Sequence, residues 1–179
     1  MSHPTAIRAF SDDIIFGDAE FTSLDPVEGE ILSLALVKPS GEEFSVELET
    51  PENTPVDPWV REHVFPHLSG EKVSREEACE RIRTFVGDSN PFLVTYVNQF
   101  DVVFLHKLFG LNQWPFRWLP LDFASMLFSA GYDPEKLFDA DKALSRSLDI
   151  PRSEAHRVHE ALNDARLLRD VYRKLLGGR

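Results

Sequence analysis

Apolar residues in the first part of the chain follow patterns typical of β-strands. The run Ile14–Phe21 predicts a buried first strand, and further strands are expected over residues 30–37 and 44–48. The Pro and Gly between the last two segments predict a turn over residues 38–41. A later apolar, β-rich run predicts another strand over residues 93–97.

Apolar residues elsewhere recur at helical spacing. Ser74 and Glu77 form a capping-box pattern that opens a helix reaching about Val86. The other helices are expected over residues 59–68, after Asp101, through Phe128, and over 134–148 and 160–176. Three strands followed by alternating helices and strands predict an α/β fold in which helices flank a mixed central β-sheet. With 179 residues and 42% hydrophobic residues, a single domain over residues 1–179 is expected.

Two carboxylates, Asp18 and Glu20, lie one residue apart at the end of the first predicted strand. Alternate residues of a strand face the same way, so these side chains converge. Adjacent anions repel, and their burial is costly unless a cation or proton compensates. Such an oxygen-rich pair suits a hard divalent cation such as Mg²⁺. The alternative for the pair alone is a solvated strand edge.

A second acidic position, Asp164, lies beside the apolar stripe of the last predicted helix, between Leu162 and Ala165. His159 precedes it by five residues, which corresponds to about 140° around a helix. The two side chains can share a site only if His159 lies in the first turn or in the preceding loop. The alternative is an ordinary helix whose acidic first turn is favoured by the helix dipole.

The central strand runs into Asn98, a residue type that favours turns and caps, and Asp101 follows near the start of a helix. Asp101 alone predicts a helix N-cap. Taken in order, however, these residues resemble the DEDDh family of 3′→5′ exonucleases, which includes oligoribonuclease, ribonuclease T and the proofreading subunit of bacterial replicases. The resemblance rests on Asp18-Ala19-Glu20, Phe100-Asp101 and His159 followed after four residues by Asp164, and it covers about residues 14–175.

This resemblance implies a ribonuclease H-like fold and a two-metal phosphodiesterase. It assigns two divalent metal ions, Mg²⁺ or alternatively Mn²⁺, to Asp18, Glu20, Asp101 and Asp164. Asp18, Glu20 and Asp164 would hold the ion that carries the attacking water, with Asp18 bridging to a second ion near Asp101. His159 would take the proton from that water. Ribonuclease H itself, an endonuclease, does not share the Asp-x-Glu pair or this His.

Within this family, the chain more closely resembles the small mycobacterial-type exoribonucleases, through Asp18-Ala19-Glu20-Phe21 and the segment from Asp57 to Val64. We therefore expect release of nucleoside 5′-monophosphates from single-stranded RNA 3′ ends, with Phe21 and Asn98 contacting the terminal nucleotide. Where many members continue the first motif with Thr-Gly-Leu, this chain has Thr22-Ser23-Leu24, which puts substrate preference in question. An exonuclease or proofreading enzyme for single-stranded DNA is the alternative. A non-catalytic nucleic-acid or partner-binding module is a further one.

The net charge of −11 argues against tight, sequence-blind binding of long nucleic acid, so short or single-stranded ends are expected. The single cysteine, Cys79, fits the buried face of a helix and a reducing compartment. No signal peptide or membrane-spanning segment is visible, which predicts a cytoplasmic protein without membrane contact. The aromatic segment from Trp114 to Phe123 suggests either core packing or a homodimer interface, and a homodimer is expected.

Overall fold

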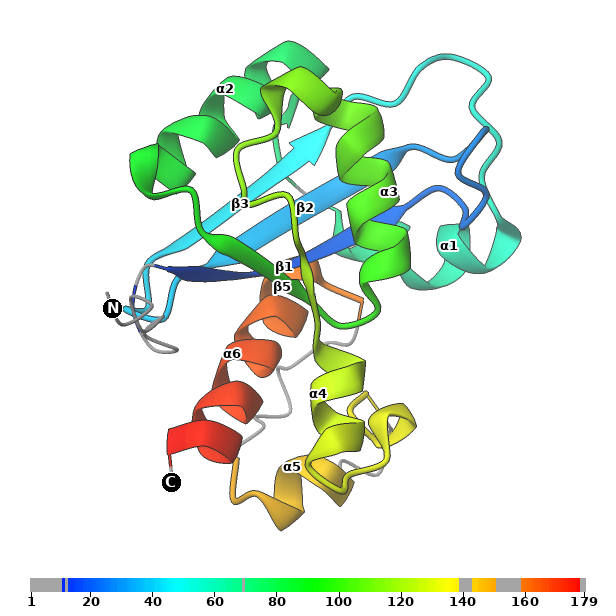
Figure 1. Ribbon diagram of the computed structural model, residues 1–179. Helices are drawn as coiled ribbons and strands as arrows, with labels where there is room; N and C mark the ends of the chain where they lie inside the picture. Colours follow the sequence, from blue (N-terminus) through cyan, green and yellow to red (C-terminus); the bar gives the residue numbers. More distant parts are fainter. Residues whose placement is uncertain (1–10, 12, 69, 139–142, 151–158, 178–179) are drawn as a thin grey trace.

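Six strands form one mixed β-sheet in the order β4-β3-β2-β1-β5-β6 (Figure 1). The computed structural model of the protein describes residues 11, 13–68, 70–138, 143–150 and 159–177. The strands are β1 (Ile14–Phe21), β2 (Ile31–Val37), β3 (Glu43–Leu48), β4 (Lys72–Val73), β5 (Phe92–Thr95) and β6 (Leu121–Asp122). β2 pairs antiparallel with both β1 and β3, whereas the β1–β5, β5–β6 and β3–β4 pairs are parallel. The predicted mixed α/β sheet is therefore confirmed.

The helices of the described chain are α1 (Pro58–His63), α2 (Arg75–Val86), α3 (Asn98–Phe109), α4 (Phe123–Ser129), α5 (Ala143–Ser147) and α6 (Ala161–Gly177). Ser74 caps α2 as predicted, and its hydroxyl accepts a hydrogen bond from the Glu77 N–H at 3.2 Å. The helix expected over residues 59–68 ends early, and a 3₁₀ turn, Phe65–His67, follows it. Pro66 has no N–H to continue an α-helical ladder, which explains the change.

The expected helix over residues 134–148 consists, in its described parts, of a 3₁₀ turn (Pro134–Lys136) and α5, while residues 139–142 lie outside the described residues. The alternative in which Asp101 is simply a helix N-cap does not hold. α3 already begins at Asn98, so Asp101 lies within its first turn. The residue that precedes the helix is Val97, whose side chain cannot cap.

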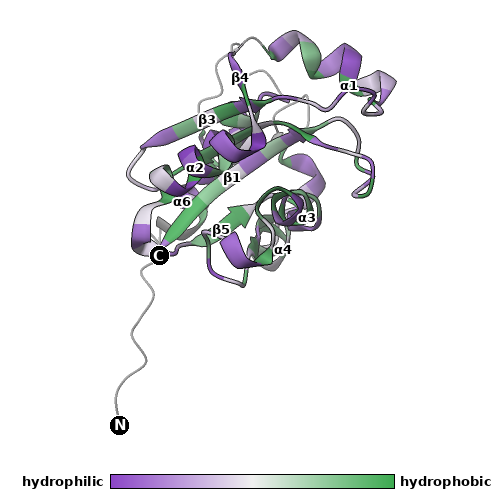
Figure 2. Cartoon of the chain, turned by 90° about the horizontal axis from the view of Figure 1, so that it is seen from above, coloured by the Kyte–Doolittle hydropathy of each residue, from purple (hydrophilic) through white to green (hydrophobic). Residues whose placement is uncertain are grey.

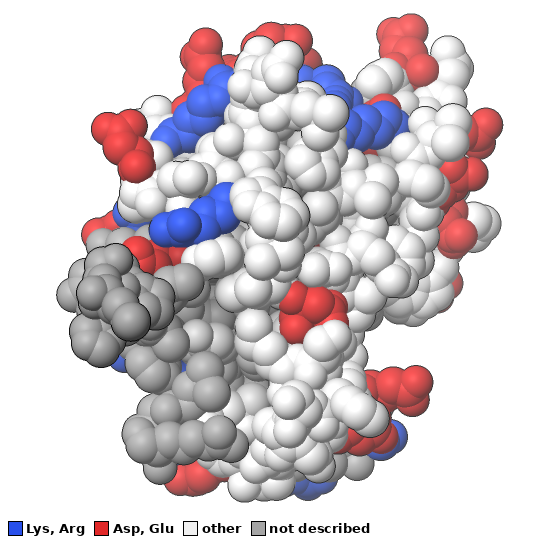
Figure 3. All heavy atoms as spheres, in the orientation of Figure 1, with Lys and Arg blue, Asp and Glu red and all other residues white. Residues whose placement is uncertain are grey.

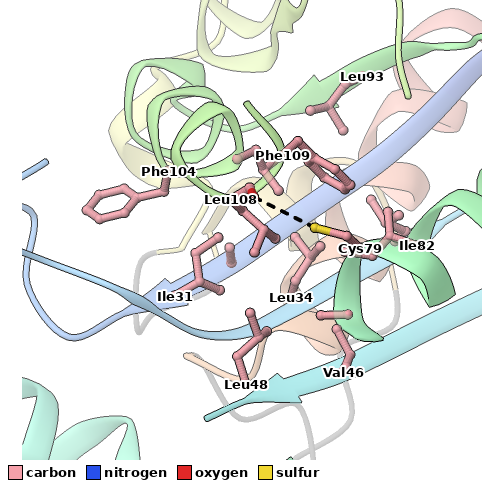
Figure 4. Packing of buried hydrophobic residues seen from close by; sticks show 14 of the residues in the cluster. Ile31, Leu34, Val46, Leu48, Cys79, Ile82, Leu93, Phe104, Leu108 and Phe109 are labelled. Atoms are coloured by element: carbon pink, nitrogen blue, oxygen red, sulfur yellow. Dashed lines mark hydrogen bonds between the residues drawn. The ribbon is translucent and has the colours of Figure 1, made fainter. Parts of the chain in front are cut away.

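Two hydrophobic layers enclose the sheet. α2 and α3 cover one face and α6 packs across β1 and β2 on the other (Figure 1). Figure 2 shows hydrophobic residues along much of β1 and β5, as expected for strands covered on both faces. In the α2–α3 layer, the buried thiol of Cys79 lies 3.7 Å from the carbonyl oxygen of Leu108 (Figure 4). The prediction that Cys79 is a core residue is confirmed.

The aromatic segment contributes mainly to the core. Phe116 and Phe123 are buried, and the Trp114 ring stacks on His106 with centroids 4.1 Å apart. Trp118 differs, because 85% of its surface is exposed. Within the described part of the chain, no helix combines the length and apolar character needed to cross a bilayer.

Candidate metal centre

Strand β1 carries two carboxylates on the face of the sheet that α6 covers. Ile14 and Phe16 pack into the α6 core cluster, and strand alternation places Asp18 and Glu20 further along the same face. The β1–β2 register pairs Asp18 with Ala35 and Glu20 with Ser33. Both acids therefore have a small residue as their cross-strand neighbour on β2. On this face of β1, the apolar residues Ile14 and Phe16 give way to the two carboxylates.

Two helices bring one further acid each to this end of β1. α3 follows β5, which runs parallel to β1, and it supplies Asp101 from its first turn. α6 supplies Asp164, also from its first turn. The two side chains are 6% and 5% exposed, and Glu20 is 9% exposed, so three of the four carboxylates are nearly removed from solvent.

His159 lies two residues before Ala161, the first residue of α6. It is therefore in the preceding loop, where it must lie if it is to share a site with Asp164. Its backbone has a positive φ of 68°, and its N–H donates a 3.0 Å hydrogen bond to Asp164 Oδ2. This turn brings one potential ligand atom from each of Glu20, His159 and Asp164 within 4.8 Å of the others. In the part of the chain that the structure describes, these three residues form a group of His, Cys, Asp or Glu side chains close enough to hold a metal ion.

The carboxylates strongly disfavour one another's ionisation. Burial raises the pKa of Asp18 well above its usual value, and the charges of Asp164, Asp101 and Glu20 raise it further. Burial, followed by the charges of Asp164 and Asp101, raises the pKa of Glu20 to about 8. Burial also raises the pKa of Asp101 to about 7. Divalent cations would remove this repulsion, so the donor set fits a metal site.

The imidazole of His159 is held against an aromatic pair. Its ring meets the edge of Trp59 with centroids 4.7 Å apart, and Trp59 stacks on His63 at 4.5 Å. The ring nitrogen Nδ1 of His63 donates to the carbonyl oxygen of Trp59 at 2.9 Å and fixes this stack. Burial, followed by the charges of His63 and His67, lowers the pKa of His159.

A cavity of about 490 Å³ opens over these groups. All four carboxylates and His159 line it, together with Phe21. Apolar and aromatic side chains make up much of the remaining wall, with Asp57 as a fifth acid, and the described lining contains no Lys or Arg. The other lining residues are Ala19, Ser23, Leu24, Trp59, Val60, Val64, Tyr96, Val97, Phe100 and Phe138.

Asn98, expected to contact the terminal nucleotide, is not among these lining residues. Its backbone N–H instead donates to Asp122 Oδ1 at 3.3 Å. Asp122 also accepts from the Ser125 N–H at 2.8 Å and caps α4. Asp122 thus has a structural role as the cap of α4.

Several cavity residues were not found from the sequence. Ser23 and Leu24 come from the loop after β1, and Tyr96 and Phe138 approach from beyond β5. The position of Trp59 could have been predicted, because this residue directly follows Asp57 and Pro58 at the start of α1. Pro in the first turn and an Asp cap fix where that helix begins, and hence where the ring lies.

No model of a known protein family matches the chain. The chain is 28% identical over 171 residues to DNA polymerase III subunit epsilon of Rickettsia felis, and 26% identical to that of Rickettsia conorii. Each match covers 90% of this chain and 73% of the relative.

Among solved structures, it is similar to exonuclease I of Methylocaldum szegediense (TM-score 0.70, 18% identity) and to E. coli exonuclease I in complex with a dA16 oligonucleotide (TM-score 0.69, 16% identity). These matches cover 93% of this chain but only 40% and 41% of the exonuclease I chains.

The similarity to these solved structures shows the fold of the chain. The chain has the α/β, ribonuclease H-like fold of these exonucleases.

Proposed function

We propose that this protein is a metal-dependent 3′→5′ exonuclease that releases nucleoside 5′-monophosphates from single-stranded nucleic acid. One observation carries the proposal: Asp18, Glu20, Asp101, Asp164 and His159 line a single cavity at the end of β1. The raised pKa values of three of these acids support a role in holding cations. A protein that only used the fold as a scaffold would have no need to bury such a costly cluster.

The four carboxylates would hold two divalent ions, Mg²⁺ or alternatively Mn²⁺. Glu20, Asp164 and Asp18 would serve one ion, with Asp18 shared and Asp101 serving the other. When bound, such ions lower the pKa of an attacking water and stabilise charge on the leaving 3′ oxygen. The chain's part is to fix these oxygens on β1 and on the first turns of α3 and α6, so that they need no rearrangement.

His159 would accept the proton of the attacking water. Its lowered pKa keeps the imidazole neutral, and thus able to accept a proton, down to below the usual value of 6.5. Trp59 limits rotation of the ring by meeting it edge-on. The 3.0 Å bond from the His159 N–H to Asp164 fixes the backbone of the base relative to a metal ligand.

The walls of the cavity suit a terminal nucleotide. Phe21, Trp59 and Phe100 line it, and aromatic rings stack on bases of any sequence. Because the described lining has no Lys or Arg, the cavity would form few direct ion pairs with backbone phosphates. A single-stranded or short 3′ end therefore fits better than a long duplex.

Either nucleic acid remains a candidate. The similarity to DNA polymerase III subunit epsilon and to exonuclease I, seen with an oligonucleotide of deoxyadenosine, favours single-stranded DNA. RNA is supported by the resemblance of Asp18–Phe21 and of the segment around Trp59 to exoribonucleases. The choice depends on whether the cavity contacts a ribose 2′-OH.

A matched pair of RNA and DNA strands, identical in sequence and labelled at the 5′ end, tests the proposal. With Mg²⁺, the purified protein should shorten at least one strand in single-nucleotide steps from the 3′ end, and a 3′-phosphate should slow the first step. Chelator should stop the reaction. The ratio of kcat/KM for the two strands identifies the substrate, and the absence of a stepwise ladder from either strand would reject the proposal.

We further propose that two copies associate through the exposed apolar residues of the α3 face. Val103, Leu111, Trp118 and Leu119 are exposed on α3 and the segment that follows it. Figure 3 shows that the centre of this face is largely uncharged, which is typical of surfaces that pack against another protein. Only Trp118 and Leu119 of the aromatic segment take part, since Phe116 and Phe123 are in the core.

A further inference from the structure

The loop between β1 and β2 forms one rim of the cavity, through Ser23 and Leu24. Its two ends are joined, because the Thr22 N–H donates to the Glu30 carbonyl oxygen at 2.9 Å and the Glu30 N–H donates to the Thr22 hydroxyl at 3.0 Å. The Thr22 carbonyl oxygen also accepts from the Asp57 N–H at 2.9 Å. The base of the loop is thereby tied to the cap of α1, which carries another wall of the cavity.

The loop is wound tightly inside these ties. Asp25 accepts from the Val27 N–H through its side chain and from the Gly29 N–H through its carbonyl oxygen, both at 2.8 Å. A Cβ at Gly29 would lie 2.6 Å from the carbonyl oxygens of both Ser23 and Asp25, so only glycine fits there. The position of Leu24 therefore depends on how this compact turn is held against the rest of the protein.

A lysine of α3 binds the backbone of this turn. Lys107 Nζ donates to the carbonyl oxygens of Gly29 at 2.6 Å and Val27 at 3.1 Å, and it pairs with Glu30 at 2.9 Å. Arg75 binds the other oxygen of Glu30 at 2.7 Å and the Lys107 carbonyl oxygen at 2.8 Å. The three charged side chains are only 17–34% exposed, so these charge-assisted bonds are partly shielded from water.

The same helix carries a proposed metal ligand. Asp101 lies in the first turn of α3 and Lys107 in its last turns. Phe104, between them, stacks on Phe21 of β1 with centroids 4.2 Å apart. α3 thus forms a rigid link with the carboxylate at one end and the loop anchor at the other.

We propose that Lys107 is a positioning residue that fixes the Ser23–Leu24 rim relative to Asp101 and thereby sets the affinity for the terminal nucleotide. This inference rests on the proposed function, because the cavity must hold the substrate. Loss of the Lys107 bonds frees the loop but leaves the four carboxylates and His159 in place. The consequence should appear in KM rather than in kcat.

Steady-state kinetics on a short single strand with saturating Mg²⁺ separate these two parameters. Lys107→Met should raise KM about tenfold, which corresponds to about 1.4 kcal/mol of binding, while kcat stays within about threefold. Lys107→Arg should restore most of the affinity because it keeps the donors and the charge. Lys38→Met is the matched control, since Lys38 forms an ion pair with Glu42 at 2.6 Å outside the cavity lining and should leave KM unchanged.

A double-mutant cycle with Leu24→Ala tests whether Lys107 acts through the rim. Leu24 is 57% exposed, so its truncation should spare the fold and raise KM. If Lys107 acts by placing Leu24, the KM of the double variant should be no higher than that of the single variant with the higher KM. Fully additive losses, an unchanged KM in Lys107→Met, or an equal effect of Lys38→Met would each overturn the proposal.

Amide hydrogen exchange without substrate provides a readout that is independent of catalysis. Exchange at residues 24–29 should quicken in Lys107→Met but not in Lys38→Met. If the wild-type protein hydrolyses no strand, the proposed function fails, whereas unchanged exchange in this loop refutes the anchor itself. Should Lys107→Met not fold, Lys107→Gln is measured in the same way, and unfolding of both variants would also refute a purely positioning role.

Discussion

Replacing Glu20 by Gln should stabilise the metal-free protein at pH 8 while it abolishes catalysis. In the folded chain, the pKa of Glu20 is raised from 4.5 to about 8. The folded state therefore holds a proton between these two pH values that the unfolded state has released. Because the folded state binds more protons, the contribution of Glu20 to stability is fully present below pH 4.5 and is lost as the pH rises toward about 8.

The gain in stability from Glu20→Gln can be calculated from the pKa shift and, separately, from the repulsion between charges. A rise from 4.5 to about 8 corresponds to roughly 5 kcal/mol. Separately, Glu20 and Asp164 offer oxygens within 4.8 Å of each other, and two unit charges at that distance repel by about 3.5 kcal/mol at an effective dielectric constant near 20. Glutamine keeps the volume and removes the charge, so a gain of about 2–5 kcal/mol is expected, or roughly 5–15 °C in Tm for a chain of this size.

Thermal unfolding in chelator at pH 5 and pH 8 measures this gain. Wild type should lose stability between the two conditions, and Glu20→Gln should lose less, because only Asp18 and Asp101 then contribute raised pKa values. Glu62→Gln, an exposed position on α1, is the matched control and should behave as wild type. Added Mg²⁺ should stabilise wild type more than Glu20→Gln. A Glu20→Gln variant less stable than wild type at pH 8 in chelator would refute the reasoning.

Three further predictions concern the proposed metal site and the proposed dimer. Asp164→Asn should reduce turnover by several orders of magnitude yet fold normally, since Asn retains an acceptor for the His159 N–H; wild-type rates in this variant would contradict its role as a ligand. His159→Ala should lose about 10²–10⁴-fold in kcat, and the wild-type acid limb should have its midpoint below about 6.5 because the pKa of His159 is lowered. His156→Ala, at a position outside the described residues, should be nearly silent, and the reverse ranking would defeat the assignment. Light scattering should give about twice the chain mass of 20.4 kDa, and Trp118→Ala should shift it toward the monomer; a monomeric wild type at micromolar concentration would exclude the dimer.

The parts of the fold that depend on local patterns were predictable from the sequence. β2 and β3 begin within one residue of their predicted starts, and the Ser74 cap of α2 forms as the Ser-x-x-Glu pattern predicts. Strand alternation predicted that Asp18 and Glu20 converge, and the five-residue spacing predicted that His159 precedes the helix of Asp164. That Asp101 joins these residues was expected only from the resemblance to the DEDDh exonucleases, because no local rule brings the three elements together.

The errors came from features that local patterns do not determine. Asp101 has the residue type of a cap, yet α3 starts three residues earlier, so Asp101 lies inside the first turn and lines the cavity. Lys107 looks like an ordinary basic residue near a helix end, and its contacts with Val27 and Gly29 span about eighty positions in sequence. Such long-range contacts, like the entry of Leu24 into the cavity, appear only once the sheet and helices are assembled.

Release of the terminal nucleotide from a 3′-labelled single strand tests the assignment of this cavity most directly. With Mg²⁺, wild type should release the label as a nucleoside 5′-monophosphate in the first turnover, before shorter 5′ products accumulate. Chelator and Asp101→Asn should each prevent release while the melting curve still shows a folded protein. Label that stays on longer fragments, or that is released equally well by Asp101→Asn, would contradict a metal-dependent 3′→5′ exonuclease site.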